Sequence, residues 1–177
     1  MGALAIVAVL VAAALAARRA GVDGERLQQE LLALGALAAP VFILFFAVGE
    51  LLHLPGIVFV LVARHVFGPV MGLAVGYAGA VFALTVSFAV ARLLVRAARA
   101  TREPWRPRWA PLRRAFERLE NRPVRNVALL RLVLWLTPPL TYALAATRVR
   151  GRDHLLGSAL GLVVPVIGVH VLYGAIG

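Results

Sequence analysis

The chain contains no cysteine and no lysine, and only eight of its 177 residues are acidic. The absence of cysteine excludes disulfide bonds, thiolate catalysis and cysteine-based metal sites. The 19 basic residues are all arginine and give a formal charge of +11. The sequence also lacks a Walker loop, a dinucleotide-binding glycine fingerprint and a zinc motif. The four histidines have no metal-ligand spacing, and no catalytic triad is apparent, so we predict no enzyme activity, metal or cofactor.

Hydrophobic residues are abundant instead. They make up 62% of the chain, and the mean hydropathy is +0.87. A soluble domain is nearer ~45–50% apolar, and one of this length could not bury the surplus. We therefore predict an all-α integral membrane protein, with one domain and a handful of spans of about 20 residues each.

The N-terminal segment, 1–17, is apolar and is followed by Arg18 and Arg19. A secretory signal would carry its positive charges before the apolar run rather than after it. We predict a retained transmembrane helix over residues 1–17 and a polar connector over residues 18–30. The rest of the chain, 31–177, is predicted to be a single membrane domain.

Residues 31–66 are apolar but interrupted. Pro40 can kink a helix, and Pro55-Gly56 is a turn signal because proline lacks a backbone N–H and glycine permits unusual dihedral angles. Glu50 and Arg64 place charges within the same run. A lipid-facing helix would not tolerate this set, whereas a re-entrant hairpin shielded by protein would.

Residues 66–91 form an uninterrupted span. Gly68, Gly72, Gly76 and Gly79 recur near one face of it at a spacing of three or four residues. Small residues at this spacing let helices approach closely. We predict that these glycines serve packing rather than ligand binding.

Residues 92–126 are strongly basic and contain eleven arginines against three glutamates. Because the stretch lies between apolar segments, we predict a cytoplasmic loop with affinity for the membrane surface, not a nucleic-acid interface. Trp105 and Trp109 suit the headgroup level. Arg113 and Arg114 belong to a short amphipathic segment, which fits either a helix on an anionic leaflet or one packed under the bundle.

A second interrupted segment covers residues 127–149, with its break at Pro138-Pro139, and a last span covers residues 154–176. The two halves align when Pro55 is placed on Pro138, which also places Gly68 on Gly151. If the basic loop between the copies is cytoplasmic, the copies have opposite orientations. The predicted fold is an inverted repeat of a re-entrant helical hairpin plus a transmembrane helix, an arrangement typical of transporter substrate sites.

Two stretches resemble the DedA/VTT superfamily, whose members are also called SNARE-associated membrane proteins. Residues 62–92 carry its first pattern and residues 131–149 its second. The matching motifs are Phe67-Gly68-Pro69, Gly72, Gly79-Ala80, Phe88, Arg92, Arg131-Leu132, Tyr142-Ala143 and Thr147-Arg148-Val149. The resemblance covers residues 45–176 and is specific as a set.

The chain departs from the family pattern at three positions. Leu134, Thr141 and Ile57 stand where family members commonly have proline, asparagine and an acidic residue. The chain is therefore closer to the VTT branch than to DedA proper. The resemblance implies two facing re-entrant hairpins, a multi-pass location in the cell membrane, here the bacterial inner membrane, and movement of lipid between leaflets. Bacterial members imply polyprenyl phosphate or phosphatidylethanolamine as cargo, and eukaryotic relatives imply phospholipid scrambling.

Glu50 and Arg131 are the main candidate site residues. Glu50 is the only acidic residue between Glu30 and Glu103. A carboxylate at membrane depth costs ~2.5–3.5 kcal/mol, so it is a candidate proton carrier or cation partner, unless it merely pairs with an arginine. Arg131 lies deep in the second interrupted segment, and its planar fork suits a phosphate, although it could also snorkel from a helix end.

Other residues are predicted to line the same translocation site. Arg64 is either a second phosphate contact or an interface anchor, and His53 is a weak candidate for a proton relay with Glu50. The turns contribute Pro55, Gly56, Pro138, Pro139 and Tyr142.

Three functions stay open at this point. The first is a lipid translocase or scramblase that acts on phospholipid or polyprenyl phosphate. The second is a proton- or cation-coupled transporter of a small solute. The third is a non-catalytic protein that organises the membrane. Association into a homo-oligomer is also left open.

Overall fold

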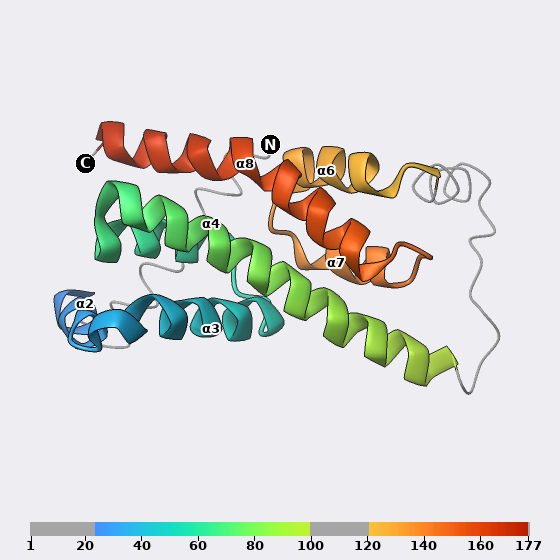
Figure 1. Cartoon of the computed structure of the whole chain (residues 1–177), viewed down its shortest axis with the longest axis horizontal. Coiled ribbons are helices and arrows are strands. Elements are labelled where there is room, and N and C mark those ends of the chain that lie inside the picture. Colours follow the sequence, from blue (N-terminus) through green and yellow to red (C-terminus); the bar gives the residue numbers. More distant parts are fainter. Residues whose placement is uncertain (1–23, 100–120, 177) are drawn as a thin grey trace. The chain divides into compact units, whose positions relative to one another are not determined.

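The computed structural model describes residues 24–99 and 121–176, and within these ranges the chain is helical without strands (Figure 1). The elements are α2 (Gly24–Leu32), the 3₁₀ helix η1 (Gly35–Leu37), α3 (Ala38–Leu51), α4 (Gly56–Arg99), α6 (Pro123–Leu134), α7 (Pro138–Ala145) and α8 (Gly151–Ile176). The chain divides into two compact units, Met1–Phe42 and Ile43–Gly177, with the division inside α3.

The described part of the first unit contains α2, η1 and the first turn of α3. Gly35 separates α2 from α3 with a φ of 56°, a value that glycine adopts without strain. Pro40 does not interrupt α3, because it lies in the first turn, where backbone N–H groups have no intrahelical acceptor. The expectation that Pro40 kinks a helix is therefore wrong.

In the second unit, α3 ends in a Schellman motif. His53 adopts a φ of 63°, its N–H donates to the Glu50 carbonyl at 3.1 Å, and the Leu54 N–H donates to the Gly49 carbonyl at 2.9 Å. This pair of bonds satisfies carbonyls that the helix end leaves without partners. Pro55 and Gly56 follow at once and begin the next helix.

Helix α4 consists of two limbs that meet at Gly68, whose φ of 78° and ψ of −176° are not helical. We call residues 56–67 the returning limb and residues 69–99 the long limb. A Cβ on Gly72 would lie 2.5 Å from the Ala63 carbonyl oxygen, and one on Gly76 would lie 3.6 Å from the Val60 Cα. Gly72 is nine positions after Ala63, and Gly76 is sixteen positions after Val60. Contacts whose separation grows in this way on both sides of Gly68 require the two limbs to run antiparallel, so the chain reverses at Gly68-Pro69. The predicted packing role of Gly72 and Gly76 is thereby confirmed.

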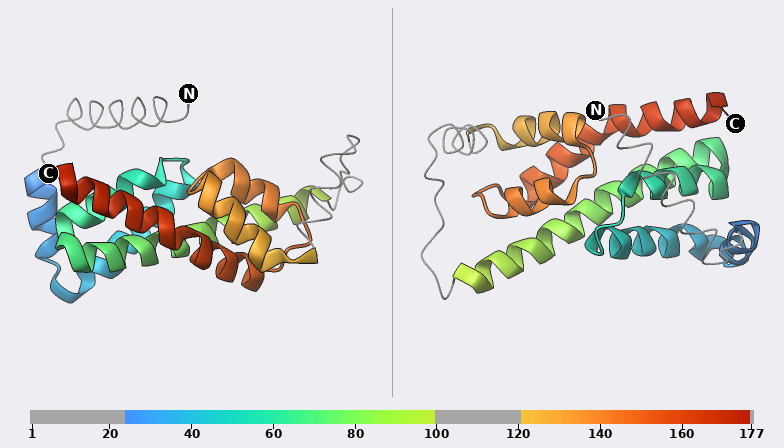
Figure 2. Two further views of the ribbon diagram at one scale, coloured as in Figure 1. Left: turned by 90° about the horizontal axis from the view of Figure 1, so that it is seen from above. Right: turned by 180° about the vertical axis from the view of Figure 1, so that it is seen from behind.

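The second half of the unit begins with α6, which ends at Trp135, a residue with a φ of 56°. A short turn leads into α7, which starts with Pro138 and Pro139. Helix α6 then packs along α8: Gly157 faces Val127, and Gly161 faces Ala128. The contact positions rise together along both helices, so α6 and α8 run parallel (Figure 2).

The long limb of α4 runs antiparallel to α8. The Tyr77 hydroxyl donates to the Ala159 carbonyl at 2.7 Å, and nearer the other end Arg92 donates to the Val149 carbonyl at 2.5 Å. Figures 1 and 2 show the two helices progressing in opposite directions. An apolar cluster that includes Phe88, Val127 and Leu144 joins the long limb of α4 to α6 and α7.

Several predicted boundaries shift. The span expected to run uninterrupted over residues 66–91 is wrong at its start, because the chain reverses at Gly68. It continues as helix to Arg99, because arginine is a good helix former and its charge does not end a helix. The last helix starts at Gly151 instead of residue 154. The basic loop expected over residues 92–126 is thus helical at both ends, where α4 finishes and α6 begins.

Other predictions lie outside the described residues. These are the span over residues 1–17, residues 18–23 of the connector, and the surface residues Trp105, Trp109, Arg113 and Arg114.

Among the described residues, two helices have the length and apolar composition to cross a membrane: Gly56–Ala97, which includes the reversal at Gly68, and Gly151–Ala175. Helix α8 has 26 residues, which corresponds to about 39 Å and exceeds a hydrocarbon core of ~30 Å. Large apolar side chains on its surface, such as Leu160, Val164 and Leu172, are more than half exposed. Surface of this kind is expected where lipid replaces water.

Candidate functional site

The site begins with a carboxylate that has no hydrogen-bond partner. Glu50 lies in the last turn of α3, and only 2% of the residue is exposed. Neither Oε1 nor Oε2 is hydrogen-bonded within the described part of the chain. An unsatisfied buried carboxylate is costly, so its persistence in a fold needs a nearby positive charge or a functional reason.

The positive charge is Arg131, on the last turn of α6, which is fully buried. Its Nη1 donates to the Trp135 carbonyl at 2.9 Å, and its Nη2 donates to the Thr141 hydroxyl at 2.7 Å. The first bond satisfies a carbonyl just past the end of α6, and the second reaches α7. Arg131 therefore holds the α6–α7 turn together.

Arg131 also reaches α8. Its Nη2 lies 3.3 Å from Nε2 of His154, a fully buried residue whose ring stacks on Phe88 at 4.1 Å. A guanidinium offers only donors, so Nε2 must accept in this bond, and the ring is neutral with its proton on Nδ1. That Nδ1 has no partner among the described residues.

Glu50 and Arg131 interact electrostatically, although no hydrogen bond joins them. They are 81 positions apart in the sequence and come from α3 and α6. Two charges taken out of water cost several kcal/mol each, and their attraction repays this fully only when hydrogen bonds are complete. Within residues 24–99 and 121–176 the Glu50 oxygens and Arg131 Nε have no hydrogen-bond partner, which leaves bonding capacity for a polar group of another molecule.

The two proline-containing turns meet beside this pair. A Cβ on Gly56 would lie 2.7 Å from Cδ1 of Leu136, in the α6–α7 turn. The His53 ring stacks on the Tyr142 ring with centroids 5.5 Å apart. The turn at Pro55-Gly56 is therefore packed against the turn that precedes α7. Pro139 is exposed in the first turn of α7.

Two predicted site residues lie differently from the expectation. Arg64 is beside Tyr173, 5.9 Å from the ring centroid, and is nine residues from Pro55 along the returning limb, or about 13 Å. It is therefore not grouped with Glu50 and Arg131. His53 is exposed and does not hydrogen-bond the Glu50 carboxylate, so no direct relay joins the two side chains.

Sequence reasoning missed Thr141, His154 and Phe88 as parts of this site. His154 lies one turn inside an apolar helix. A titratable ring at such a position in the sequence is a signal that could have identified it as a site residue. Thr141 was noted only as a departure from a family pattern, and no sequence signal pairs it with Arg131. In residues 24–99 and 121–176 no group of three or more His, Asp or Glu residues could hold a metal ion.

The described residues form helices without strands, two of them long and apolar, around a buried charge pair, which is an architecture that fits a membrane protein. Residues 54–175 match the VTT domain, which is more than half of the chain. The protein therefore belongs to the DedA/VTT family, as the resemblance of its motifs predicts. Comparison with curated proteins and with solved structures gives no match.

Proposed function

We propose that this protein moves the polar headgroups of lipids between the two leaflets of a membrane. The observation that carries the proposal is the buried Glu50 carboxylate, unpartnered and facing Arg131 where the two turns meet. A zwitterionic headgroup has a cation and a phosphate, which these two side chains complement. The lipid tails would remain in the hydrocarbon while the headgroup passes the pair.

Two matching copies support re-entrant hairpins and an inverted repeat. In the first copy Gly79 packs on Phe46, and in the second Gly161 packs on Ala128, with the same separation along the chain in both. Each copy thus runs helix, turn, short helix, turn and long helix. The two long helices are antiparallel, as opposite orientations of the copies require. Breaks in corresponding positions of two such halves point to a substrate site at their interface.

The test is leaflet exchange in reconstituted liposomes. Fluorescent phosphatidylethanolamine and phosphatidylcholine, and a polyprenyl phosphate, are each followed by their accessibility to a membrane-impermeant quencher or phosphatase. We expect exchange above that of empty vesicles, and a loss of at least about tenfold in Glu50→Gln and Arg131→Gln, since each loses one charge-assisted contact. Arg125→Gln is the matched control, because Arg125 lies on the same helix and is exposed.

A rate equal to that of empty vesicles for every lipid would contradict the proposal. A coupled solute transporter is the second candidate, because a lone buried carboxylate can carry a proton. That candidate predicts solute uptake that depends on a pH gradient and is lost in Glu50→Gln, whereas lipid exchange without a gradient favours the lipid translocase.

A further inference from the structure

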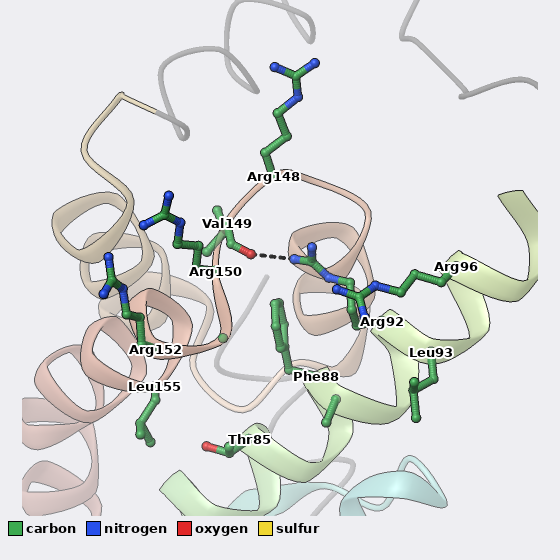
Figure 3. A pocket seen from close by; sticks show the side chains of 12 residues that line it. Thr85, Phe88, Arg92, Leu93, Arg96, Arg148, Val149, Arg150, Arg152 and Leu155 are labelled. Carbon is green, nitrogen blue, oxygen red and sulfur yellow. Dashed lines mark hydrogen bonds between the residues drawn. The ribbon is translucent and has the colours of Figure 1, made fainter.

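A second polar feature adjoins the Glu50–Arg131 site through Phe88, whose ring stacks on His154 and also lines a pocket. This pocket of about 700 Å³ is formed where the end of α4 faces the α7–α8 link and the first turns of α8 (Figure 3). Twelve residues line it, five of them arginine and none acidic. The arginines are Arg92, Arg96, Arg148, Arg150 and Arg152.

The arginines stand on two sides of the pocket. Arg92 and Arg96 come from the long limb of α4, whereas Arg150 and Arg152 come from the other wall, and Arg148 extends away from these four in the view of Figure 3. Arg92 is held in place, because Nη2 donates to the Val149 carbonyl and the guanidinium lies 4.8 Å from the Phe88 ring centroid. One wall is therefore rigid and already cationic.

The charge around the pocket is strongly one-sided. Asp153 lies 3.8 Å from Arg152 and offsets one of the five positive charges of the lining. Guanidinium groups gathered around one pocket repel one another, and a bound anion would relieve this repulsion. Arginine is the side chain best suited to a phosphoryl group, because its planar fork donates two parallel hydrogen bonds.

The rest of the lining is apolar. Phe88, Leu93 and Leu155 belong to it, and Leu93 is 64% and Leu155 39% exposed on the outer surface of the helices. A free phosphate ion would gain nothing from contact with these apolar side chains. An amphiphile would place its phosphoryl group among the arginines and its apolar chain along Leu93 and Leu155.

We propose that this pocket binds the phosphoryl headgroup of an anionic lipid at the membrane surface. Affinity of a basic segment for an anionic leaflet explains the number of arginines but not their position around a pocket with an apolar wall. The proposal deepens the proposed function, on which it rests for the step from binding to translocation. Binding itself is independent of that step.

The experiment measures binding to the purified full chain in a neutral maltoside detergent. The probes are dioctanoyl phosphatidic acid, dioctanoyl phosphatidylcholine and inorganic phosphate, each titrated by calorimetry at low salt. We expect phosphatidic acid to bind at least about tenfold more tightly than either of the others, since only it has both an exposed phosphate and apolar chains. Binding should weaken as salt is raised.

The test variant is Arg96→Gln/Arg150→Gln, which removes one exposed charge from each side of the pocket. Two lost charge-assisted contacts should weaken phosphatidic acid binding about tenfold or more. The control is Arg122→Gln/Arg125→Gln, which removes two exposed arginines outside the lining and should leave affinity within about twofold. Both variants change exposed side chains, and matching thermal unfolding midpoints verify that they are folded.

Equal weakening by the two variants would overturn the pocket as the site, and equal affinity for phosphate and phosphatidic acid would overturn a lipid as the occupant. The outcome is separable from that of the translocation proposal. Binding with no leaflet exchange contradicts translocation alone. Exchange that persists while phosphatidic acid fails to bind contradicts the pocket alone.

Discussion

Arg131 combines two tasks in one side chain. It fastens the α6–α7 turn through the Trp135 carbonyl and the Thr141 hydroxyl, and it provides the charge that faces Glu50. Arginine suits both roles because the N–H donors of its planar guanidinium point in different directions and can reach several partners at once. Lysine, in contrast, is a point charge on a flexible stem.

The Thr141 hydroxyl is therefore expected to matter for stability. Thr141→Val leaves a buried guanidinium donor without its acceptor, which should lower the free energy of unfolding by ~1–3 kcal/mol. Titration with a denaturing detergent, followed by circular dichroism, measures this. The control is Thr85→Val, whose hydroxyl bonds the Val81 carbonyl in its own helix, and its effect should be smaller. An equal effect of both substitutions would argue against a special role of the Arg131–Thr141 bond.

At the scale of the element, the chain turns sharply at the ends of α3 and α6 and inside α4, and a different type of residue adopts the positive φ at each turn. The α3 end uses His53 and the α6 end uses Trp135, both with positive φ, whereas the reversal inside α4 uses Gly68. Aromatic side chains at strained positions suggest that their ring contacts, such as that of His53 with Tyr142, outweigh the local cost. Gly68 has no side chain, so no ring contact there could offset the cost of a positive φ in another residue.

Gly68→Ala should consequently destabilise the protein. A φ of 78° with a ψ of −176° is adopted essentially only by glycine, and another residue there costs ~1–3 kcal/mol. The alignment of Pro55 with Pro138 places Gly151 at the matching position of the second copy. Gly151 has no positive φ and open space around its Cβ position, so Gly151→Ala is the control and should be neutral within ~0.5 kcal/mol. Comparable losses of unfolding free energy in both variants would refute this assignment of the reversal.

At the scale of the whole molecule, five arginines gather at one end of the two antiparallel long helices. The arginine pocket lies where α4 ends and α8 begins, while Val70 and Ala175 lie at the opposite ends of the same helices. An excess of arginine marks the cytoplasmic side of a membrane protein. The arrangement thus defines an orientation that can be measured.

The absence of native cysteine makes that measurement direct. In intact cells, a membrane-impermeant maleimide should label Val70→Cys and Ala175→Cys, whereas Arg96→Cys and Arg152→Cys should react only after permeabilisation. All four positions are exposed, so access from one side rather than burial decides the labelling. Labelling of all four in intact cells, or the reverse pattern, would contradict the proposed orientation.

How much of the site follows from the sequence depends on the residue. Glu50 and Arg131 were found because isolated charges within apolar segments are rare and costly, and the structure brings them close together. Arg64 has the same sequence signal yet lies beside Tyr173, because the reversal at Gly68 carries its limb toward the C-terminal end of α8. Arg148 and Arg150 lie far from Arg96 in the sequence, and only the fold places all three at one pocket.

The sequence by itself determined that lipid surrounds the protein, where its helices are interrupted and which family it belongs to. The apolar surplus requires lipid, proline and glycine interrupt helices through local dihedral and hydrogen-bond chemistry, and the motifs match the VTT domain. These properties depend on composition or on residues a few positions apart. The tertiary structure alone decided which charges meet, that Thr141 and His154 hold Arg131, and that a pocket forms beside Arg92. Those contacts join residues ten to more than eighty positions apart, and they depend on which helix faces lie against one another.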